Sequence, residues 1–411
     1  MKKENKLLHI LGEVDEQFIM EAAPETKPRV RKKVQIIKYG SIVACLVCIV
    51  YGGIKSFSGR KPLSSSSGHT QTELPHLTIG EYFQDGMGFE GYFVNDISEL
   101  VNKNPWSEDL HLKTLPVFQN CLTHDEHYIL HGANIEEMKK YLLEIASRFG
   151  LEEEKLKIYN NDMYIKENAS DNKQLKEEEI RSYGPTQIYV KDKEISICVD
   201  QDMTVTITFD PAISLPKEYR FSYDSSYEEL EKVGDYIKET YDNVIQMEQP
   251  EVNITGGDYD IDKQQRYQLS FYNKSDDSIQ NIIDYNFNQI NFYCDYEDKL
   301  WMIRIFHKNL TKKIGDYPII TKESATKELI SGNYFTTCPY SFTDETYIAK
   351  SELVYHTSEY ESYFIPFYCF YVELPEEKMD NGLKTYGTYY VPAVEPSYIS
   401  DLPVNKDAFD E

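Results

Sequence analysis

One apolar run near the beginning of the chain constrains its organisation more than any other feature. The run extends from Val34 to Ile54, and a helix needs about 20 mostly apolar residues to cross a membrane. Lys38 lies near one end, where its long stem can reach the interface, and Tyr39 and Tyr51 occupy positions typical of interfacial aromatic residues. The sequence therefore predicts one transmembrane helix over residues 34–54.

The charges beside this run predict its orientation. The segment before it carries a basic cluster, whereas only scattered basic residues follow it; these are Arg29, Arg31, Lys32 and Lys33 before, and Lys55 and Arg60 after. Basic residues concentrate on the cytoplasmic side of membrane helices. We therefore expect a cell-membrane protein with a cytoplasmic N-terminus and a C-terminal part outside the cytoplasm.

Two other interpretations of the run were weighed. A cleaved secretory signal has a short apolar core and a small-residue cleavage pattern, and here the preceding segment is too long and no such pattern follows. A lipoprotein signal is the closer alternative, because Ile42 to Cys45 resembles a lipobox that ends in an acylated cysteine. The run continues to Ile54 without turning polar, which favours the membrane helix.

Charge is divided unequally by the run. Of 43 basic and 69 acidic residues, 9 and 6 lie within residues 1–38, and 34 and 63 lie from residue 55 onward. Binding of nucleic acid or anionic lipid needs basic surface. The acidic C-terminal part therefore excludes a nucleic-acid partner and is compatible with cationic ligands.

The segment before the run predicts an amphipathic cytoplasmic helix with a basic linker over residues 1–33. Its apolar face has helical spacing and comprises Leu7, Leu8, Leu11, Val14 and Phe18. A helix this short is marginal alone in water, so the face needs a partner or the membrane surface. Acidic residues beside the face, such as Glu13 and Asp15, disfavour anionic lipid and favour a protein partner.

This segment also carries a resemblance. Leu7 to Pro24, followed by a basic stretch and a single span, resembles the N-terminal region of clostridial-type membrane proteins regarded as anti-sigma factors. The resemblance implies that the helix holds an extracytoplasmic-function sigma factor. It implies no cofactor and no catalytic residue, and the segment lacks a zinc-binding histidine and cysteine set, since His9 is its only histidine.

After the run we expect a serine-rich linker over residues 55–77 and then an α+β ectodomain of helix-plus-antiparallel-sheet modules. Three modules are predicted, over residues 78–225, 226–316 and 317–411. The first helix is predicted to begin after the capping residue Asn134, the second to run from about Ser226 to Val244, and the third to be capped by Thr321 or Ser324. Strands are predicted at residues 115–118, 187–190, 194–199, 203–209, 266–273, 290–296, 299–308, 346–356, 363–373 and 384–394.

Two parts of the ectodomain share a pattern. Residues 195–209 and 290–306 each form a strand, an acidic turn and a strand, with a cysteine late in the first strand. This predicts a duplicated helix-plus-sheet module. The third, tyrosine-rich module has a short helix before antiparallel strands and is similar to PepSY-type regulator modules in its order of elements.

Two polar clusters were considered as metal sites. His124, His127 and His131 lie close together with Asp125 and Glu126, but their spacing does not match His-Glu-x-x-His. The segment is therefore predicted to be a solvated hairpin tip.

The second cluster, Gly256 to Asp262, has alternating aspartates like a calcium loop. Lys263 and Leu269 stand where such a loop needs glycine and glutamate, so residues 256–262 are predicted to be a solvated loop entering a strand. No metal ligand and no cofactor is therefore predicted.

No catalytic motif is present. The sequence has no Gly-x-Ser-x-Gly and no phosphate-binding glycine loop. The five cysteines after the run are widely spaced, so one disulfide is possible but its pairing is undetermined. We expect a signalling protein that is not an enzyme, with a sigma factor inside and an unknown ligand or protein outside. The alternative is an extracytoplasmic binding or envelope-assembly protein without a sigma-factor partner.

Overall fold

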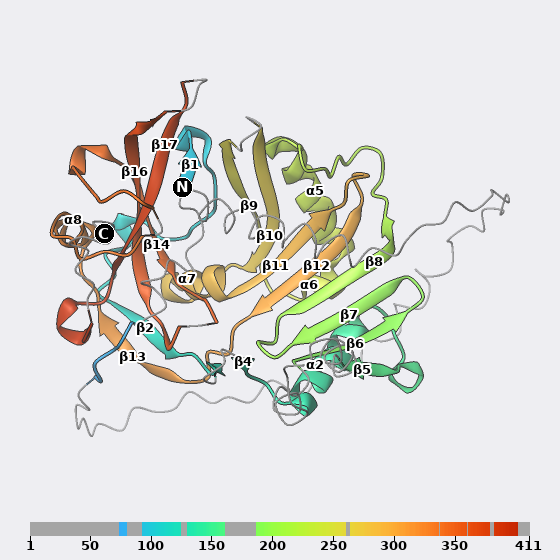
Figure 1. Ribbon diagram of the computed structural model, residues 1–411. Helices are drawn as coiled ribbons and strands as arrows, with labels where there is room; N and C mark the ends of the chain where they lie inside the picture. The colour runs from blue at the N-terminus through green and yellow to red at the C-terminus, as the bar shows by residue number, and fades with distance from the viewer. Residues whose placement is uncertain are drawn as a thin grey trace, which may run out of the picture. The chain divides into compact units, whose positions relative to one another are not determined.

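The computed structural model describes residues 74–79, 93–124, 130–160, 186–259, 264–336, 338–359, 361–378 and 382–401. The chain divides into two units, Met1–Gln71 and Thr72–Glu411, and every described residue belongs to the second. This unit combines a few helices with antiparallel sheets (Figure 1). The predicted α+β class is therefore confirmed for it.

The largest sheet has eight strands and is built from two halves that meet in its middle. Every neighbouring pair is antiparallel. In spatial order the strands are β5 (Ile158–Asn160), β6 (Gln187–Asp192), β7 (Ile195–Asp200), β8 (Val205–Ile213), β12 (Leu300–His307), β11 (Asn288–Cys294), β10 (Gln265–Asn273) and β9 (Pro250–Tyr259). The last strand of each half forms the central seam, where Ile207 of β8 lies opposite Ile303 of β12.

Capped helices pack on this sheet. They are α2 (Ile135–Arg148), α5 (Tyr227–Thr240) and the short α6 (Asp242–Ile245). Capping boxes begin the two long helices, at the predicted cap Asn134 and at Ser226, near which the second helix was predicted to begin. Helix α2 contacts β6 and β7, and α5 contacts β9 and β10. Their apolar faces form one core with the sheet, in which Leu142 and Ile237 are fully buried. Each such side chain stabilises the fold by about 1.5–3 kcal/mol.

The remaining strands form three smaller sheets. The four-stranded sheet has the order β1 (Phe93–Asn95), β17 (Lys384–Pro392), β16 (Pro366–Lys378) and β14 (Ile348–Tyr355), and the three-stranded sheet has the order β13 (Lys313–Pro318), β2 (Thr114–Gln119) and β15 (Tyr363–Phe364). Strands β3 (Thr123–His124) and β4 (Leu130–His131) form a hairpin. One strand was predicted over residues 363–373, but the chain forms β15 and then β16, which begins at Pro366 and is central in its own sheet.

Two other helices follow in the sequence, one between β10 and β11 and one between β13 and β14. Helix α7 (Ser278–Phe287) precedes β11, and α8 (Lys322–Ile330) is capped by Thr321, as predicted. The short 3₁₀ helices are η3 (Ile97–Glu99), η4 (Glu108–Leu110), η5 (Glu153–Lys155), η6 (Glu345–Tyr347) and η7 (Pro396–Tyr398).

Buried tyrosines hold the smaller sheets together. Tyr317 and Tyr389 are fully buried, and Tyr355 nearly so. Their hydroxyls donate to the carbonyl oxygens of Pro75, Tyr340 and Pro116, respectively, over 2.7–2.8 Å. A tyrosine ring suits an apolar core, and its hydroxyl must find a partner when buried. Many of the tyrosines of this chain therefore serve to pack the core.

Several stretches differ from the sequence-based predictions, because strands β1, β9 and β13 and the short β5 were not predicted. Gly256 to Asp258, predicted as a loop, lie within β9, where Gly256 and Gly257 adopt positive φ (114° and 104°). A Cβ on either glycine would come within about 2.2 Å of a backbone oxygen. Glycine at these positions therefore allows neighbouring backbone segments to lie this close together. Helix α7 was not predicted. All five cysteines in the described residues are free, so no disulfide forms among them.

Several predictions concern the undescribed part of the chain. Among the described residues no helix is both long and apolar enough to cross a membrane. The predicted transmembrane helix at residues 34–54 and most of the linker predicted at 55–77 lie outside the described residues. The end of the predicted linker is part of the folded unit, because Leu77 is fully buried and its amide donates to the Tyr398 carbonyl over 2.7 Å. The module boundaries at 225/226 and 316/317 stay predictions. Strands β1 and β2, from the first predicted module, pair with β17, β13 and β15 in the third module or at its border.

Candidate functional site

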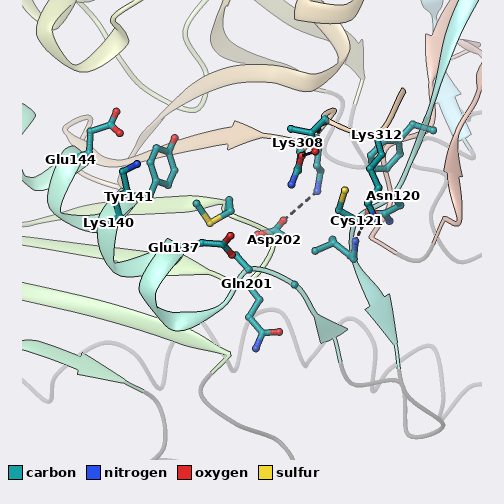
Figure 2. Close-up of a pocket in the computed structure, with 17 residues that line it drawn as sticks. Asn120, Cys121, Glu137, Lys140, Tyr141, Glu144, Gln201, Asp202, Lys308 and Lys312 are labelled. Carbon is teal, nitrogen blue, oxygen red and sulfur yellow. Dashed lines mark hydrogen bonds and ion pairs between the residues drawn. The ribbon is translucent and has the colours of Figure 1, made fainter. Parts of the chain in front are cut away.

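A pocket of about 550 Å³ lies where α2, the β7–β8 turn, the segment after β12 and the end of β2 meet. Figure 2 shows Lys140 and Tyr141 of α2 on one side, Asn120 and Cys121 on the other, and Asp202 between them. Its lining therefore comes from segments far apart in the sequence. We call it the junction pocket.

The β7–β8 turn forms the centre of the junction pocket because its own side chains fix its shape. The Asp202 carboxylate accepts hydrogen bonds from the Thr204 amide (2.8 Å) and hydroxyl (2.7 Å). Met203 adopts a positive φ of 66°, which most residues avoid. The Met203 amide donates to the Asp200 carbonyl over 2.9 Å. These bonds close a tight turn and leave Gln201 at its tip.

The turn tip is pressed against the segment that leads into α2. The Gln201 carbonyl accepts a hydrogen bond from the Ala133 amide over 2.8 Å. A Cβ added to Gly132 would lie 2.3 Å from the Gln201 carbonyl oxygen and 2.7 Å from Leu122. Glycine is therefore required at position 132, and the turn is held by parts of the chain outside its own hairpin.

An ion pair joins the turn to the other half of the large sheet. The Lys308 ammonium lies 3.2 Å from the Asp202 carboxylate, and both side chains are only 14% exposed. Burial raises the pKa of Asp202, but Lys308 and the bonds from Thr204 outweigh it and hold that pKa below its ordinary value. Asp202 is therefore a carboxylate with its charge satisfied.

Asp200, two residues earlier, has the opposite environment. It lines a second, smaller pocket of about 260 Å³ with Arg304 and Glu359. Burial raises the pKa of Asp200 to about 6, although a hydrogen bond from Gln187 opposes the shift. The pKa values of these two aspartates, which lie in the same turn, are therefore shifted in opposite directions.

The walls of the junction pocket carry charges of both signs. Glu137, Glu144 and Asp202 are acidic, and Lys140, Lys308 and Lys312 are basic. Glu137 and Glu144 already have partners, in the α2 capping box and in a 2.8 Å pair with Arg148. Lys140 and Lys312 make no ion pair with other described residues. The pocket therefore offers two uncommitted cations in a strongly acidic chain.

The lining of the junction pocket suits the recognition of a small molecule. Cys121 lines the pocket, and no histidine is among the described residues that line it with this thiol. Three or more potential metal ligands do not gather anywhere among the described residues. What the pocket offers is space, two uncommitted ammonium groups and amide hydrogen-bonding groups, which together can bind an anionic or zwitterionic small molecule.

The sequence-predicted sites lie elsewhere. The partner-binding face of Leu7, Leu8, Leu11, Val14 and Phe18 is outside the described residues. The histidine-rich segment contains the β3–β4 hairpin, with Thr123 opposite His131, as the predicted hairpin requires. Residues 125–129 at its tip, and 260–262 of the rejected calcium loop, are also outside the described residues.

The sequence analysis identified the β7–β8 turn but not the pocket around it. The acidic pair Asp200 and Asp202 marked the turn, while the residues facing it come from distant segments and carry no common motif. Comparison of the chain with protein-family models gives no match, and comparison with curated proteins gives none either.

Proposed function

We propose that this protein is a single-pass membrane signalling protein that senses a ligand outside the cytoplasm and holds a sigma factor inside. The junction pocket carries the sensing half of the proposal. It lies where both halves of the large sheet and the three-stranded sheet meet, so an occupant would contact all three at once. Pockets at such junctions are common ligand sites.

The sigma-factor half rests on the N-terminal residues. An apolar helical face with acidic neighbours needs a protein surface to cover it. The resemblance to anti-sigma factors supplies the class of partner. The division between a short basic segment and a large acidic part supports a role that spans the membrane.

Recovery of the full-length protein from detergent-solubilised membranes of its own host tests the sigma-factor half. We expect the wild type to retain an extracytoplasmic-function sigma factor and Leu11→Asp/Val14→Asp to lose it, since two charges would enter the apolar face. Glu16→Gln, a matched change off that face, should retain it. Absence of any sigma factor with the wild type, or equal retention by the double variant, would refute the proposal.

One observation favours a second candidate. The lipobox-like sequence ending at Cys45 fits an extracytoplasmic binding or envelope-assembly protein whose mature form lacks the cytoplasmic helix. Deletion of residues 1–28 separates the two: the second candidate keeps its function, and the signalling protein loses control of its sigma factor. Mass spectrometry of Cys45 gives an independent answer, because acylation there fits only the second candidate.

A further inference from the structure

A pocket of about 460 Å³, distinct from the two described above, lies at an irregularity in β16. The pairing of β16 with β17 shifts between Glu373 and Lys378, and the shifted stretch contains Pro375, which has no amide hydrogen to donate to a ladder. Residues of this bulge line the pocket together with the segment around Tyr340. Bulges re-aim side chains and recur beside functional sites.

The floor and walls of this pocket are apolar and aromatic. Leu374 is 7% exposed and the ring of Tyr389 is fully buried, while Tyr347 is 36% exposed at the opening. Tyr340 forms a third aromatic element, and its hydroxyl donates to the Glu377 carboxylate. Tyrosine faces carry negative electrostatic potential and attract cations.

The rim of the same pocket is acidic. Glu373, Glu376 and Glu377 line it, and none of the described lining residues is basic. Of these three glutamates, Glu373 alone has a cationic partner among the described residues, Lys384 at 2.7 Å. The Glu377 carboxylate accepts a hydrogen bond from the Tyr340 hydroxyl, which carries no positive charge. The pocket therefore combines apolar and tyrosine walls with two carboxylates that pair with no described cation. This lining is suited to a positively charged group.

We propose that this pocket binds a primary ammonium or guanidinium group carried on an apolar stem. The stem would lie along Tyr340 and Pro375, over the buried Leu374 and Tyr389, and the cation would lie between Tyr347 and the glutamates Glu376 and Glu377. A lysine or arginine side chain of a basic peptide and a free polyamine share this chemistry. The site is separate from the junction pocket, has the opposite charge preference, and does not depend on the signalling function.

Calorimetric titration of the full chain in detergent, at low ionic strength, tests the proposal with three probes. N-acetyl-lysine methylamide and spermidine carry the required ammonium, and N-acetyl-norleucine methylamide has the apolar stem alone. We expect saturable binding of a charged probe, with at least about ten-fold weaker binding of the norleucine probe. Stronger binding of the lysine probe points to a peptide, and stronger binding of spermidine to a polyamine.

Variants localise the binding to this pocket. Glu376→Gln/Glu377→Gln should weaken binding about ten-fold, and Tyr347→Leu about two- to five-fold, because it removes the cation–π contact and keeps an apolar side chain. Glu239→Gln, an exposed change on α5, should bind like the wild type. Tyr347 is partly exposed, so its variant should keep the wild-type melting temperature and remain interpretable.

Three results would overturn the proposal. One is no saturable binding of either charged probe to the wild type. Another is equal binding of the norleucine probe, which would make the site merely apolar. The third is unchanged binding in both the glutamate and the tyrosine variants with wild-type melting, which would place any bound amine elsewhere on the acidic surface.

Discussion

The two hairpins at the centre of the large sheet have the same local design and different surroundings. Hairpins β7–β8 and β11–β12 each carry a cysteine late in the first strand and an acidic turn, and they lie side by side through β8 and β12. The β7–β8 turn touches the α2 segment through Gln201 and pairs with Lys308. The β11–β12 turn is open to solvent, with Tyr296 88% exposed.

The open turn is stabilised from within. The Asp295 carboxylate accepts hydrogen bonds from the Glu297 and Lys299 amides, both at 2.9 Å, and the Asp298 backbone adopts a positive φ of 60°. Nothing beyond the hairpin is needed to form it. The comparison teaches that an acidic turn becomes part of a site only when distant segments enclose it, since the turn chemistry is similar in both places.

The largest predicted difference concerns the charged pair of the enclosed turn. Asp202→Asn should lower the free energy of unfolding by about 2–3 kcal/mol at pH 7, because it leaves the Lys308 ammonium buried without its counter-charge. Because the pKa of Asp202 is lowered in the folded state, this loss should shrink as the pH falls through that pKa. Denaturant unfolding at several pH values measures it.

The matched change in the open turn is Glu297→Gln. Its carboxylate is paired with Lys299 but is 73% exposed, so removal of the charge should change stability by less than about 0.5 kcal/mol. Lys308→Met combined with Asp202→Asn completes a double-mutant cycle, and the two losses should not add. Additive losses, or equal effects of the two turns, would contradict the distinction drawn between them.

A change of opposite sign is expected at Asp200, two residues before Asp202 in the same turn. Asp200 has a pKa raised to about 6 by burial, so the folded state binds more protons than the unfolded state between about pH 4 and 6. Wild-type stability should therefore fall as the pH rises through this window. Asp200→Asn cannot ionise and should be more stable than the wild type by about 2 kcal/mol at pH 7.5.

Melting curves of wild type and Asp200→Asn at pH 3.5 and 7.5 check this. The advantage of the variant should vanish at pH 3.5, where Asp200 is protonated in both states. Asp202→Asn serves as the control, because it should be destabilising at pH 7.5. A destabilised Asp200→Asn at pH 7.5 would show that the carboxylate makes a stabilising contact.

The smallest effect is expected at the tip of the open turn. Tyr296→Ser should change the free energy of unfolding by less than about 0.5 kcal/mol, since an exposed ring buries little area. Its one aromatic neighbour, Tyr223, is itself 44% exposed at a ring distance of 5.5 Å. Chemical denaturation measures the change, and a loss above about 1 kcal/mol would mean that the open turn is enclosed after all.

Sequence patterns predicted the capped helices well because capping is local. Asn134, Ser226 and Thr321 each accept a bond from an amide three residues on, so the signal and the structure lie within one turn. Helix α7 was missed although Asp277 caps it. Its residues include β-branched isoleucines and asparagines, which have low helix propensity. Burial of Ile282 and Phe287 in the core stabilises the helix instead.

The junction pocket could be predicted only in part. The acidic turn is visible in the sequence because Asp202 and Thr204 are neighbours. Lys308 is 106 positions away from Asp202, and no local pattern indicates that they meet. Gly132 looks like an ordinary glycine until the Gln201 carbonyl is placed against it. Tertiary contact, rather than residue type, distinguishes this turn from its counterpart.

The smaller sheets impose an order on folding. Strand β1 forms its only ladder with β17, and Thr385 and Asn95, which bond to each other, are 290 positions apart. The partners of strand β2, which are β13 and β15, also come much later in the sequence. The early strands therefore remain without partners until almost the whole chain has been synthesised, and closing such long loops slows folding. A chain that stops before β17 would expose unpaired strand edges, so premature termination yields a target for degradation rather than a shorter working protein.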